Sequence, residues 1–245
     1  MAGALTGRRV LITGASSGIG AAVADAVVAA GGRVALVARS ADALAEQADR
    51  LGDAAIAAPA DVTEPADLAA AIEQAAERLG GLDAVVCSAG IVRTGGVLAS
   101  SPDDWQAMFD VNVLGVLNTV HGAVERLRSA DLADVIVVSS MSGRRRTSVA
   151  LGFYAASKFA VHVLSDTLRE ELAPEGVRVT VISPGFVNTP IFDGVPDDET
   201  RATYQQAVAT QGLDPAAVAA NVVHALAQPA GVDLVEIAML STDQR

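Results

Sequence analysis

The chain has 245 residues, a formal net charge of −12 at pH 7, 51% hydrophobic residues and one cysteine, Cys87. The apolar content excludes a disordered chain, the lone cysteine excludes a disulfide framework, and the acidic balance argues against a nucleic-acid partner. No run reaches the roughly 18 apolar residues of a membrane span, and no signal peptide is recognised, so we expect one cytoplasmic domain, residues 1–245, with no membrane partner and no metal site.

Short apolar segments alternate with helical patterns along the chain. The expected strands are Arg9–Thr13, Arg33–Val37, Ala54–Ala58, Ala84–Cys87, Val135–Ser139, Arg178–Ile182 and Leu234–Ile237. The expected helices are Ile19–Ala30, Ala41–Leu51, Ala66–Leu79, Asp104–Arg128, Tyr154–Leu172 and Ala216–Leu226. Because several strands are uninterrupted runs of Val, Ile and Leu, this order predicts an α/β fold of the Rossmann type, a doubly wound parallel sheet with helices on both faces.

A glycine-rich turn connects the first expected strand to the first expected helix. Thr13–Gly20 reads Thr-Gly-Ala-Ser-Ser-Gly-Ile-Gly. Glycines permit a tight turn and a close approach to a ligand, and the free N–H groups at a helix N-terminus attract a pyrophosphate. The alternative is a βα turn that binds nothing. The strand–turn–helix context favours a dinucleotide site that includes Gly14, Ser16, Ser17, Gly18, Ile19 and Gly20.

The end of the second strand predicts which dinucleotide binds. An acidic residue there would hold the ribose hydroxyls of NAD, but the sequence has Ala38 followed by Arg39. A guanidinium can pair with the 2′-phosphate of NADP, so we expect NADP(H) as the cofactor, the alternative being that Arg39 is only a surface residue. Asp61, after the third strand, either hydrogen-bonds the adenine edge or lies beside a helix N-cap, and the sequence leaves both open.

Tyr154 and Lys158 stand out against the composition. The chain has sixteen arginines but one lysine, and one of its two tyrosines lies four residues before that lysine. This spacing places both side chains on one face of a helix, where an ammonium lowers the pKa of a phenol and makes it a better general acid. The alternative is a surface pair without a role. The same helix carries Phe159, Val163 and Leu168 on a helical repeat.

Two polar residues and one long connection complete the expected site. Ser140 follows the fifth strand, where its hydroxyl either faces a substrate oxygen or bonds to the backbone. Asn112 lies inside the long helix expected before that strand, where an asparagine is costly unless it has a polar task such as holding a water. The weakly periodic segment 186–212 follows the carboxyl end of a strand, so we expect a substrate lid, the alternative being a mobile surface loop.

Together these motifs resemble the short-chain dehydrogenase/reductase family, in its short, single-domain, NADP-preferring branch. The resemblance covers nearly the whole chain and is carried by Thr13–Gly20, Asp61-Val62, Asn112-Val113, Ser140, Tyr154-x-x-x-Lys158, Pro184-Gly185 and Thr189-Pro190. It implies a seven-stranded parallel sheet, a homotetramer or homodimer, and an oxidoreductase that interconverts a small-molecule carbonyl compound and an alcohol with NADP(H). A partial likeness of the C-terminal segment to 3-hydroxy acid dehydrogenases favours a small polar aldehyde, ketone or hydroxy acid.

The resemblance also implies a role for each matching residue. Tyr154 gives or takes the proton during hydride transfer, and Lys158 lowers the pKa of the tyrosine and holds the nicotinamide ribose. Ser140 bonds the substrate oxygen, and Asn112 positions a water. Cofactor contacts are expected from Asp61, Val62, Ala89, Gly90, Tyr154, Lys158, Pro184, Gly185, Val187 and Thr189, and a substrate pocket from Met141, Phe186 and Phe192.

Two features depart from the family pattern. Cys87-Ser88 replaces the usual pair of asparagines, which removes two amide side chains that brace the strand end. The gap between Ser140 and Tyr154 is a residue longer than usual, and its loop holds Arg144-Arg145-Arg146. This basic run either clamps a carboxylate or phosphate substrate or forms a solvated or subunit-contacting surface.

Two other classes of function stay open on the sequence. One is a nucleotide-binding regulatory protein of the same fold without turnover, for which the altered Cys87-Ser88 pair is the only support. The other is a methyltransferase with a similar glycine turn, which leaves the Tyr154 and Lys158 pair without a purpose.

Overall fold

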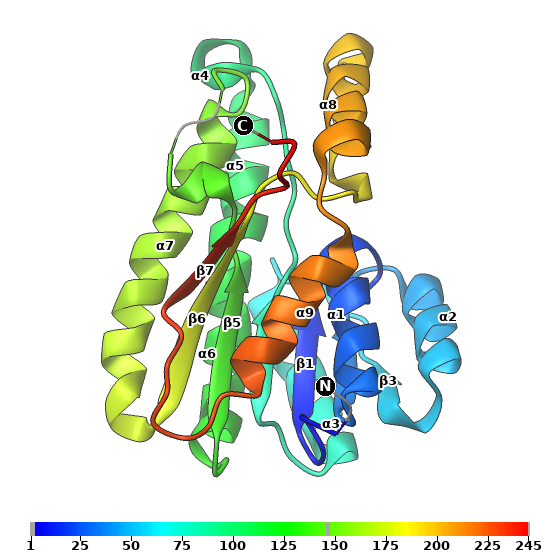
Figure 1. The fold of residues 1–245 in the computed structure, drawn as a ribbon, viewed down its shortest axis with the longest axis vertical. Helices are drawn as coiled ribbons and strands as arrows, with labels where there is room; N and C mark the ends of the chain where they lie inside the picture. Colours follow the sequence, from blue (N-terminus) through cyan, green and yellow to red (C-terminus); the bar gives the residue numbers. More distant parts are fainter. Residues whose placement is uncertain (1–2, 146–147, 245) are drawn as a thin grey trace.

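The computed structural model describes residues 3–145 and 148–244. Within these residues, seven parallel strands form one sheet in the order β3-β2-β1-β4-β5-β6-β7 (Figure 1). The strands are β1 Arg9–Thr13, β2 Arg33–Val37, β3 Ala55–Ala57, β4 Ala84–Cys87, β5 Ala133–Val138, β6 Val177–Pro184 and β7 Glu236–Met239. The predicted Rossmann-type sheet is therefore confirmed. Because the strand order reverses between β1 and β4, their carboxyl ends flank the crevice where such sheets bind ligands.

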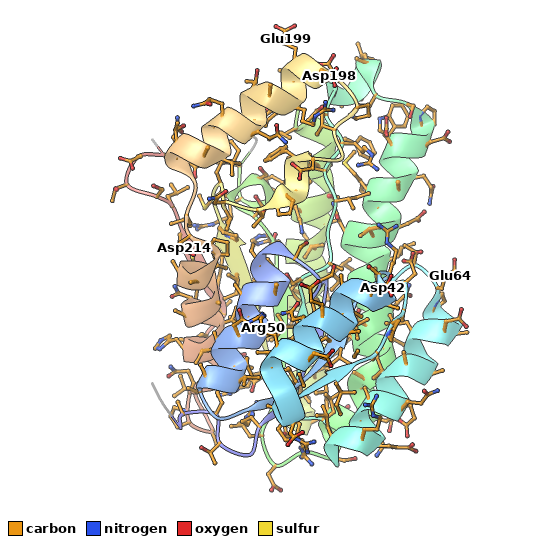
Figure 2. The ribbon with its side chains drawn as sticks, turned by 90° about the vertical axis from the view of Figure 1, so that its right-hand side faces the viewer. Asp42, Arg50, Glu64, Asp198, Glu199 and Asp214 are labelled. Carbon is orange, nitrogen blue, oxygen red and sulfur yellow. The ribbon has the colours of Figure 1, made fainter. Side chains whose placement is uncertain are left out.

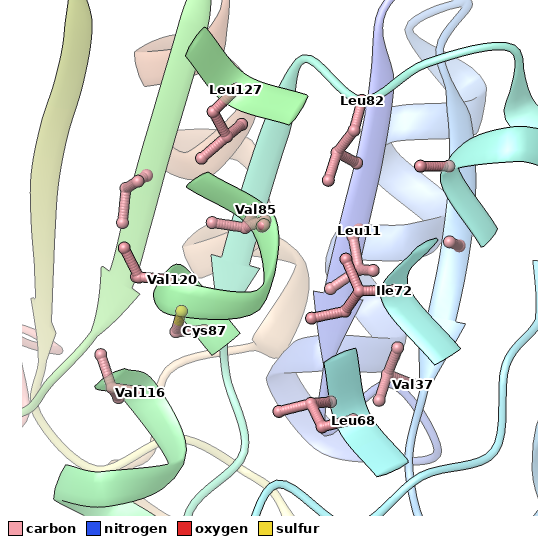
Figure 3. Packing of buried hydrophobic residues seen from close by; sticks show 14 of the residues in the cluster. Leu11, Val37, Leu68, Ile72, Leu82, Val85, Cys87, Val116, Val120 and Leu127 are labelled. Carbon is pink, nitrogen blue, oxygen red and sulfur yellow. The ribbon is translucent and has the colours of Figure 1, made fainter. Parts of the chain in front are cut away.

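Helices cover both faces of this sheet. One face packs against α3 Pro65–Leu79, α6 Gly115–Arg128 and α7 Gly152–Leu172, and the other against α1 Gly18–Ala29, α2 Ala41–Leu51 and α9 Pro215–Leu226. Successive side chains of β1 alternate between the two hydrophobic cores. Leu11 packs on the first face, and Val10 and Ile12 pack on the second. Figure 3 shows Leu68 and Ile72 of α3 close to Leu11. Burial on both faces explains why the strands are continuous apolar runs.

The helix predicted over Asp104–Arg128 has a different construction. It consists of α5 Pro102–Phe109, a π-helical turn (η2, Asp110–Leu114) and α6. By length and hydropathy, this stretch is the one helical part of the described chain that could cross a membrane, but 44% of its most apolar window is buried. Its apolar face packs on the sheet and on α3, which accounts for its composition.

The segment 186–212 contains a helix that the sequence pattern does not predict. After a short 3-10 turn (η5, Pro190–Phe192), α8 spans Asp198–Gln211 and stands beyond the carboxyl edge of the sheet (Figure 1). Asp197 caps α8, since its side chain accepts a hydrogen bond from the Thr200 N–H at 2.8 Å. Asp198 and Glu199 follow in the first turn of α8, where negative charges are favourable.

The apolar repeat on α7 divides between two environments. Phe159 is 42% exposed and Val163 is 66% exposed, whereas Val161 is buried against the sheet and Leu168 packs against the same core. Helix α7 therefore has an outer apolar stripe in addition to its buried face.

Candidate active site

A cavity of about 910 Å³ lies at the carboxyl edge of the sheet. This volume is near the top of the range of about 300–1,000 Å³ that is usual for ligand sites. The cavity is lined by every residue predicted to bind the cofactor: Gly14, Ser16, Ser17, Gly18, Ile19, Gly20, Arg39, Asp61, Val62, Ala89, Gly90, Tyr154, Lys158, Pro184, Gly185, Val187 and Thr189. It is also lined by Ser140 and by the predicted substrate residues Met141, Phe186 and Phe192.

The glycine turn is shaped as a cradle for phosphates. Gly14 and Gly18 have φ of +68° and +55°, which residues with a side chain rarely adopt. A Cβ at Gly14 would lie 2.8 Å from the Ala89 backbone, and one at Gly20 would lie 2.3 Å from the Gly14 carbonyl oxygen. Ser17 precedes α1 without capping it through its side chain, so the N–H groups of the first turn stay available to an anion. These residues fit a dinucleotide pyrophosphate.

Arg39 and Asp61 line the part of the cavity that follows β2 and β3. Arg39 is exposed and follows the partly buried Ala38. Asp61 uses one oxygen locally, because its Oδ1 accepts hydrogen bonds from the Thr63 N–H at 2.9 Å and the Thr63 hydroxyl at 2.8 Å. Asp61 thus lies beside the start of α3, which was one of the two expectations from the sequence, and it also lines the cavity.

Ser140, Tyr154 and Lys158 meet where β5 and α7 come together. Tyr154 lies in the first turn of α7 and is hydrogen-bonded to the Ser140 side chain. Lys158 lies one turn later, with its Nζ 5.9 Å from the centre of the Tyr154 ring. The ammonium also donates a hydrogen bond to the Val138 carbonyl oxygen at 3.0 Å, which anchors it to the end of β5.

Burial controls the charges of this group. Burial raises the pKa of Tyr154 from 10.0 to about 12, although the hydrogen bond from Ser140 opposes the shift. Burial lowers the pKa of Lys158 from 10.5 to about 8. The expected lowering of the tyrosine pKa by the lysine is therefore not found, because desolvation of the phenolate outweighs an ammonium that is engaged with Val138. At neutral pH, Tyr154 is protonated and most Lys158 side chains carry a charge.

Asn112 does not line the cavity, and its expected role of positioning a water stays a prediction. It is fully buried in the π-helical turn η2. Its Oδ1 accepts a hydrogen bond from the Ile91 N–H at 2.8 Å, and its Nδ2 donates to the Ile91 carbonyl oxygen at 3.0 Å and to the Ser157 hydroxyl at 3.1 Å. Both Nδ2 hydrogens are used and the Oδ1 accepts one bond, so these contacts hold the side chain in place. Asn112 braces the loop after β4 against α7, since Ser157 in turn donates to the Tyr154 carbonyl oxygen at 2.7 Å.

Aromatic side chains of the segment 186–212 cover the substrate end of the cavity. The rings of Phe192 and Tyr204 stack with centroids 4.8 Å apart, and Phe186 meets both rings edge-on. The hydroxyl of Tyr204 on α8 lies 3.1 Å from that of Ser148 in the loop before α7. This contact joins α8 to the loop before α7, and the role of the segment as a lid stays a prediction.

Comparison with known proteins agrees with this geometry. A family model described as short chain dehydrogenase matches residues 8–200. The chain belongs to the short-chain dehydrogenase family. Over an alignment of 245 residues it is 36% identical to a glycine betaine reductase of Emericella nidulans, and the alignment covers 99% of this chain and 19% of that relative. The chain thus spans about a fifth of that relative's length.

Two solved structures of short-chain dehydrogenases resemble the fold. An alcohol dehydrogenase from Thermococcus sibiricus complexed with 5-hydroxy-NADP has a TM-score of 0.86 and 29% identity, covering 97% of this chain and 98% of the other. A short-chain dehydrogenase/reductase from Burkholderia phymatum in complex with NAD has a TM-score of 0.87 and 28% identity, covering 96% and 89%. Members of this family are oxidoreductases that act on CH–OH or C=O groups of small molecules.

In this short-chain dehydrogenase, Thr13 braces the strand end that lacks the two asparagines. Its buried Oγ1 accepts hydrogen bonds from the N–H groups of Ser88 and Ala89 at 3.2 and 3.3 Å. The start of the loop after β4 is therefore held from β1 by a hydroxyl group. Cys87 itself is buried beside Val116 and Val120 of α6 (Figure 3), and burial raises the pKa of its thiol to about 12, so it is no nucleophile.

Sequence reasoning missed the C-terminal tail as part of the site. Gln244 lines the cavity, and its Oε1 accepts a hydrogen bond from the Phe186 N–H at 2.8 Å. Gly185 leaves the room for this contact, since a Cβ there would lie 2.1 Å from the Gln244 Oε1. No local sequence pattern predicts this contact, because it depends on β7 ending beside β6. Arg93, Ser148 and Gln211 also line the cavity without a signal in the sequence.

Proposed function

We propose that this short-chain dehydrogenase interconverts a carbonyl compound and an alcohol with NADP(H), using Tyr154 as general acid and base. The supporting observation is that Ser140, Tyr154 and Lys158 line one cavity with the glycine turn Gly14–Gly20. The dinucleotide, when bound there, supplies or accepts the hydride. The residues of the chain have to bind it, orient the substrate and move a proton.

In the reduction direction, Tyr154 donates its proton to the carbonyl oxygen of the substrate. Burial keeps the hydroxyl in its protonated form at neutral pH, which is the form that can donate. The phenolate that remains is stabilised by the Lys158 ammonium, which is buried with it 5.9 Å from the ring centre. Ser140 can donate a hydrogen bond to the same substrate oxygen as negative charge develops on it. In the oxidation direction the phenolate takes the proton back.

The preference for NADP rests on the end of β2. Arg39 lines the cavity where a carboxylate would otherwise select NAD, and a guanidinium can form two hydrogen bonds to a 2′-phosphate. Of the two structures compared above, one was solved with 5-hydroxy-NADP and the other with NAD. Family membership therefore does not distinguish NADP from NAD, and the expected preference for NADP depends on Arg39.

Parallel titrations with NADPH and NADH, followed by nicotinamide fluorescence, test the cofactor. We expect NADPH to bind at least about tenfold tighter, a gap of ~1.4 kcal/mol, and Arg39→Ala to remove the gap. Arg50→Ala is the matched control, because Arg50 lies on the neighbouring helix and pairs with Asp25 at 2.6 Å, outside the cavity. If the wild-type protein bound NADH as tightly as NADPH, Arg39 would be a surface residue without a role in cofactor selection.

Turnover of a carbonyl panel tests the chemistry. Tyr154→Phe should lose nearly all turnover and keep its affinity for the dinucleotide, because only the hydroxyl is removed. Activity that survives this change would overturn the proton-transfer assignment. Dinucleotide binding without turnover of any carbonyl compound would favour the alternative, a regulatory protein on this fold.

A further inference from the structure

The charge of the cavity contrasts with that of the rest of the molecule. The chain carries a net charge of −12, and acidic side chains lie at the outer beginnings of several helices (Figure 2): Asp42, Glu64, Asp198, Glu199 and Asp214. The charged residues that line the cavity, among those the structure describes, are the cations Arg39, Arg93, Arg145 and Lys158 and a single acid, Asp61. An acidic protein has thus gathered positive charge around its ligand site, and such a cleft attracts anions.

The cofactor and the catalytic group do not use all of this charge. Under the proposed function, Arg39 faces the 2′-phosphate and Lys158 faces Tyr154. Arg93 is engaged within the protein, because its guanidinium bonds the carbonyl oxygens of Val92 and Gly194 at 3.1 and 3.2 Å and lies 3.5 Å from a carboxylate oxygen of Asp104.

Arg145 is different. Among the described residues, no carboxylate lies within ion-pair distance of its guanidinium, and its backbone N–H donates a hydrogen bond to the Met141 carbonyl oxygen at 3.2 Å. Its neighbour Arg144 is paired with Glu236 of β7 at 3.4 Å. Arg146, the third member of the basic run, lies outside the described residues. Of the two described arginines of this run, Arg145 alone lines the cavity, at an exposed position.

We propose that Arg145 binds a carboxylate of the substrate, which makes the substrate an anionic carbonyl compound with an apolar body. The apolar part follows from Met141, Phe186, Phe192 and Tyr204, which line the same cavity as Arg145. One uncompensated guanidinium matches one carboxylate in charge and in planar geometry. This inference rests on the proposed function and specifies its substrate class.

The test compares acids with their neutral esters as substrates. The probes are 4-formylbenzoate with methyl 4-formylbenzoate and 4-oxobutanoate with methyl 4-oxobutanoate, assayed with whichever nicotinamide cofactor the protein binds. We expect the wild-type protein to prefer the acids in kcat/KM and Arg145→Gln to lower this preference about tenfold, as for a partly solvent-screened contact between arginine and carboxylate. Arg145→Lys should keep part of the preference, which should also weaken with added salt.

Arg144→Gln is the matched control, since it removes the same charge from the same loop outside the cavity and should leave the acid-to-ester ratio unchanged. The inference is wrong if Arg145→Gln lowers turnover equally for acids and esters, or if the wild-type protein does not prefer the acids. Either result leaves the proposed function intact. If the wild-type protein turned over no carbonyl compound at all, both the proposed function and this inference would be wrong. A readout without turnover is calorimetry on the protein saturated with cofactor, where benzoate must bind more tightly than methyl benzoate for the inference to stand.

Discussion

Replacing Lys158 with methionine should stabilise the protein while it ends turnover. The side chain is 5% exposed, and burial lowers its pKa from 10.5 to about 8. This difference corresponds to roughly 3 kcal/mol against folding at pH 7, at about 1.4 kcal/mol per tenfold change. Methionine keeps the length and the apolar stem but loses the bond from Nζ to the Val138 carbonyl oxygen, about 1 kcal/mol. We therefore expect the free energy of unfolding of Lys158→Met, measured without nucleotide, to be about 2 kcal/mol higher than that of the wild type.

The sign of the pH dependence follows from the direction of the pKa shift. Between pH 8 and 10.5 the unfolded chain binds a proton at Lys158 that the folded chain has lost, so wild-type stability gains from this group as the pH rises. The advantage of Lys158→Met should narrow by about 1 kcal/mol between pH 7 and pH 9. Burial raises the pKa of Cys87 from 9.0 to about 12, which acts in the opposite direction, but up to pH 9 the folded thiol keeps its proton with or without the Lys158 charge.

Urea unfolding followed by circular dichroism at pH 7, 8 and 9 measures both quantities. Tyr154→Phe is the control, because Tyr154 titrates near pH 12 and its removal adds no pH dependence in this range. A Lys158→Met protein that is less stable than the wild type at pH 7, or whose advantage does not change with pH, would refute the description of Lys158 as a desolvated ammonium.

Three further outcomes are expected. Thr13→Val keeps the side-chain shape but leaves two backbone N–H groups after β4 without an acceptor, so urea unfolding should show a loss of about 2 kcal/mol; an unchanged midpoint would mean that water replaces the hydroxyl. Gln244→Ala releases the Phe186 N–H, so KM for the carbonyl substrate should rise several-fold with little change in stability, whereas Asp243→Ala should leave KM unchanged. Phe159→Glu places a charge on the exposed apolar stripe of α7, so light scattering should show a smaller assembly if this stripe joins the subunits of the expected homo-oligomer.

The sequence was sufficient for the features that depend on local conformation. The turn Thr13–Gly20 requires glycines because of positive φ angles and close backbone contacts, and both requirements are readable from residue type and spacing. Tyr154 and Lys158 share a helix face because their spacing is four, whatever the rest of the chain does. The strands were recognisable because burial on both faces demands continuous apolar runs.

Features that depend on distant partners were decided by the tertiary structure. The Tyr154 pKa rises because burial outweighs the lysine, and no spacing rule contains the degree of burial. Asn112 braces Ile91 from a buried position in a π-helical turn, and Asp197 caps α8, a helix that the sequence pattern does not predict. Gln244 reaches the site from the far end of the chain because β7 ends beside β6. Local sequence determines the conformations that a segment can adopt, but desolvation and long-range contacts exist only once the sheet has brought the segments together.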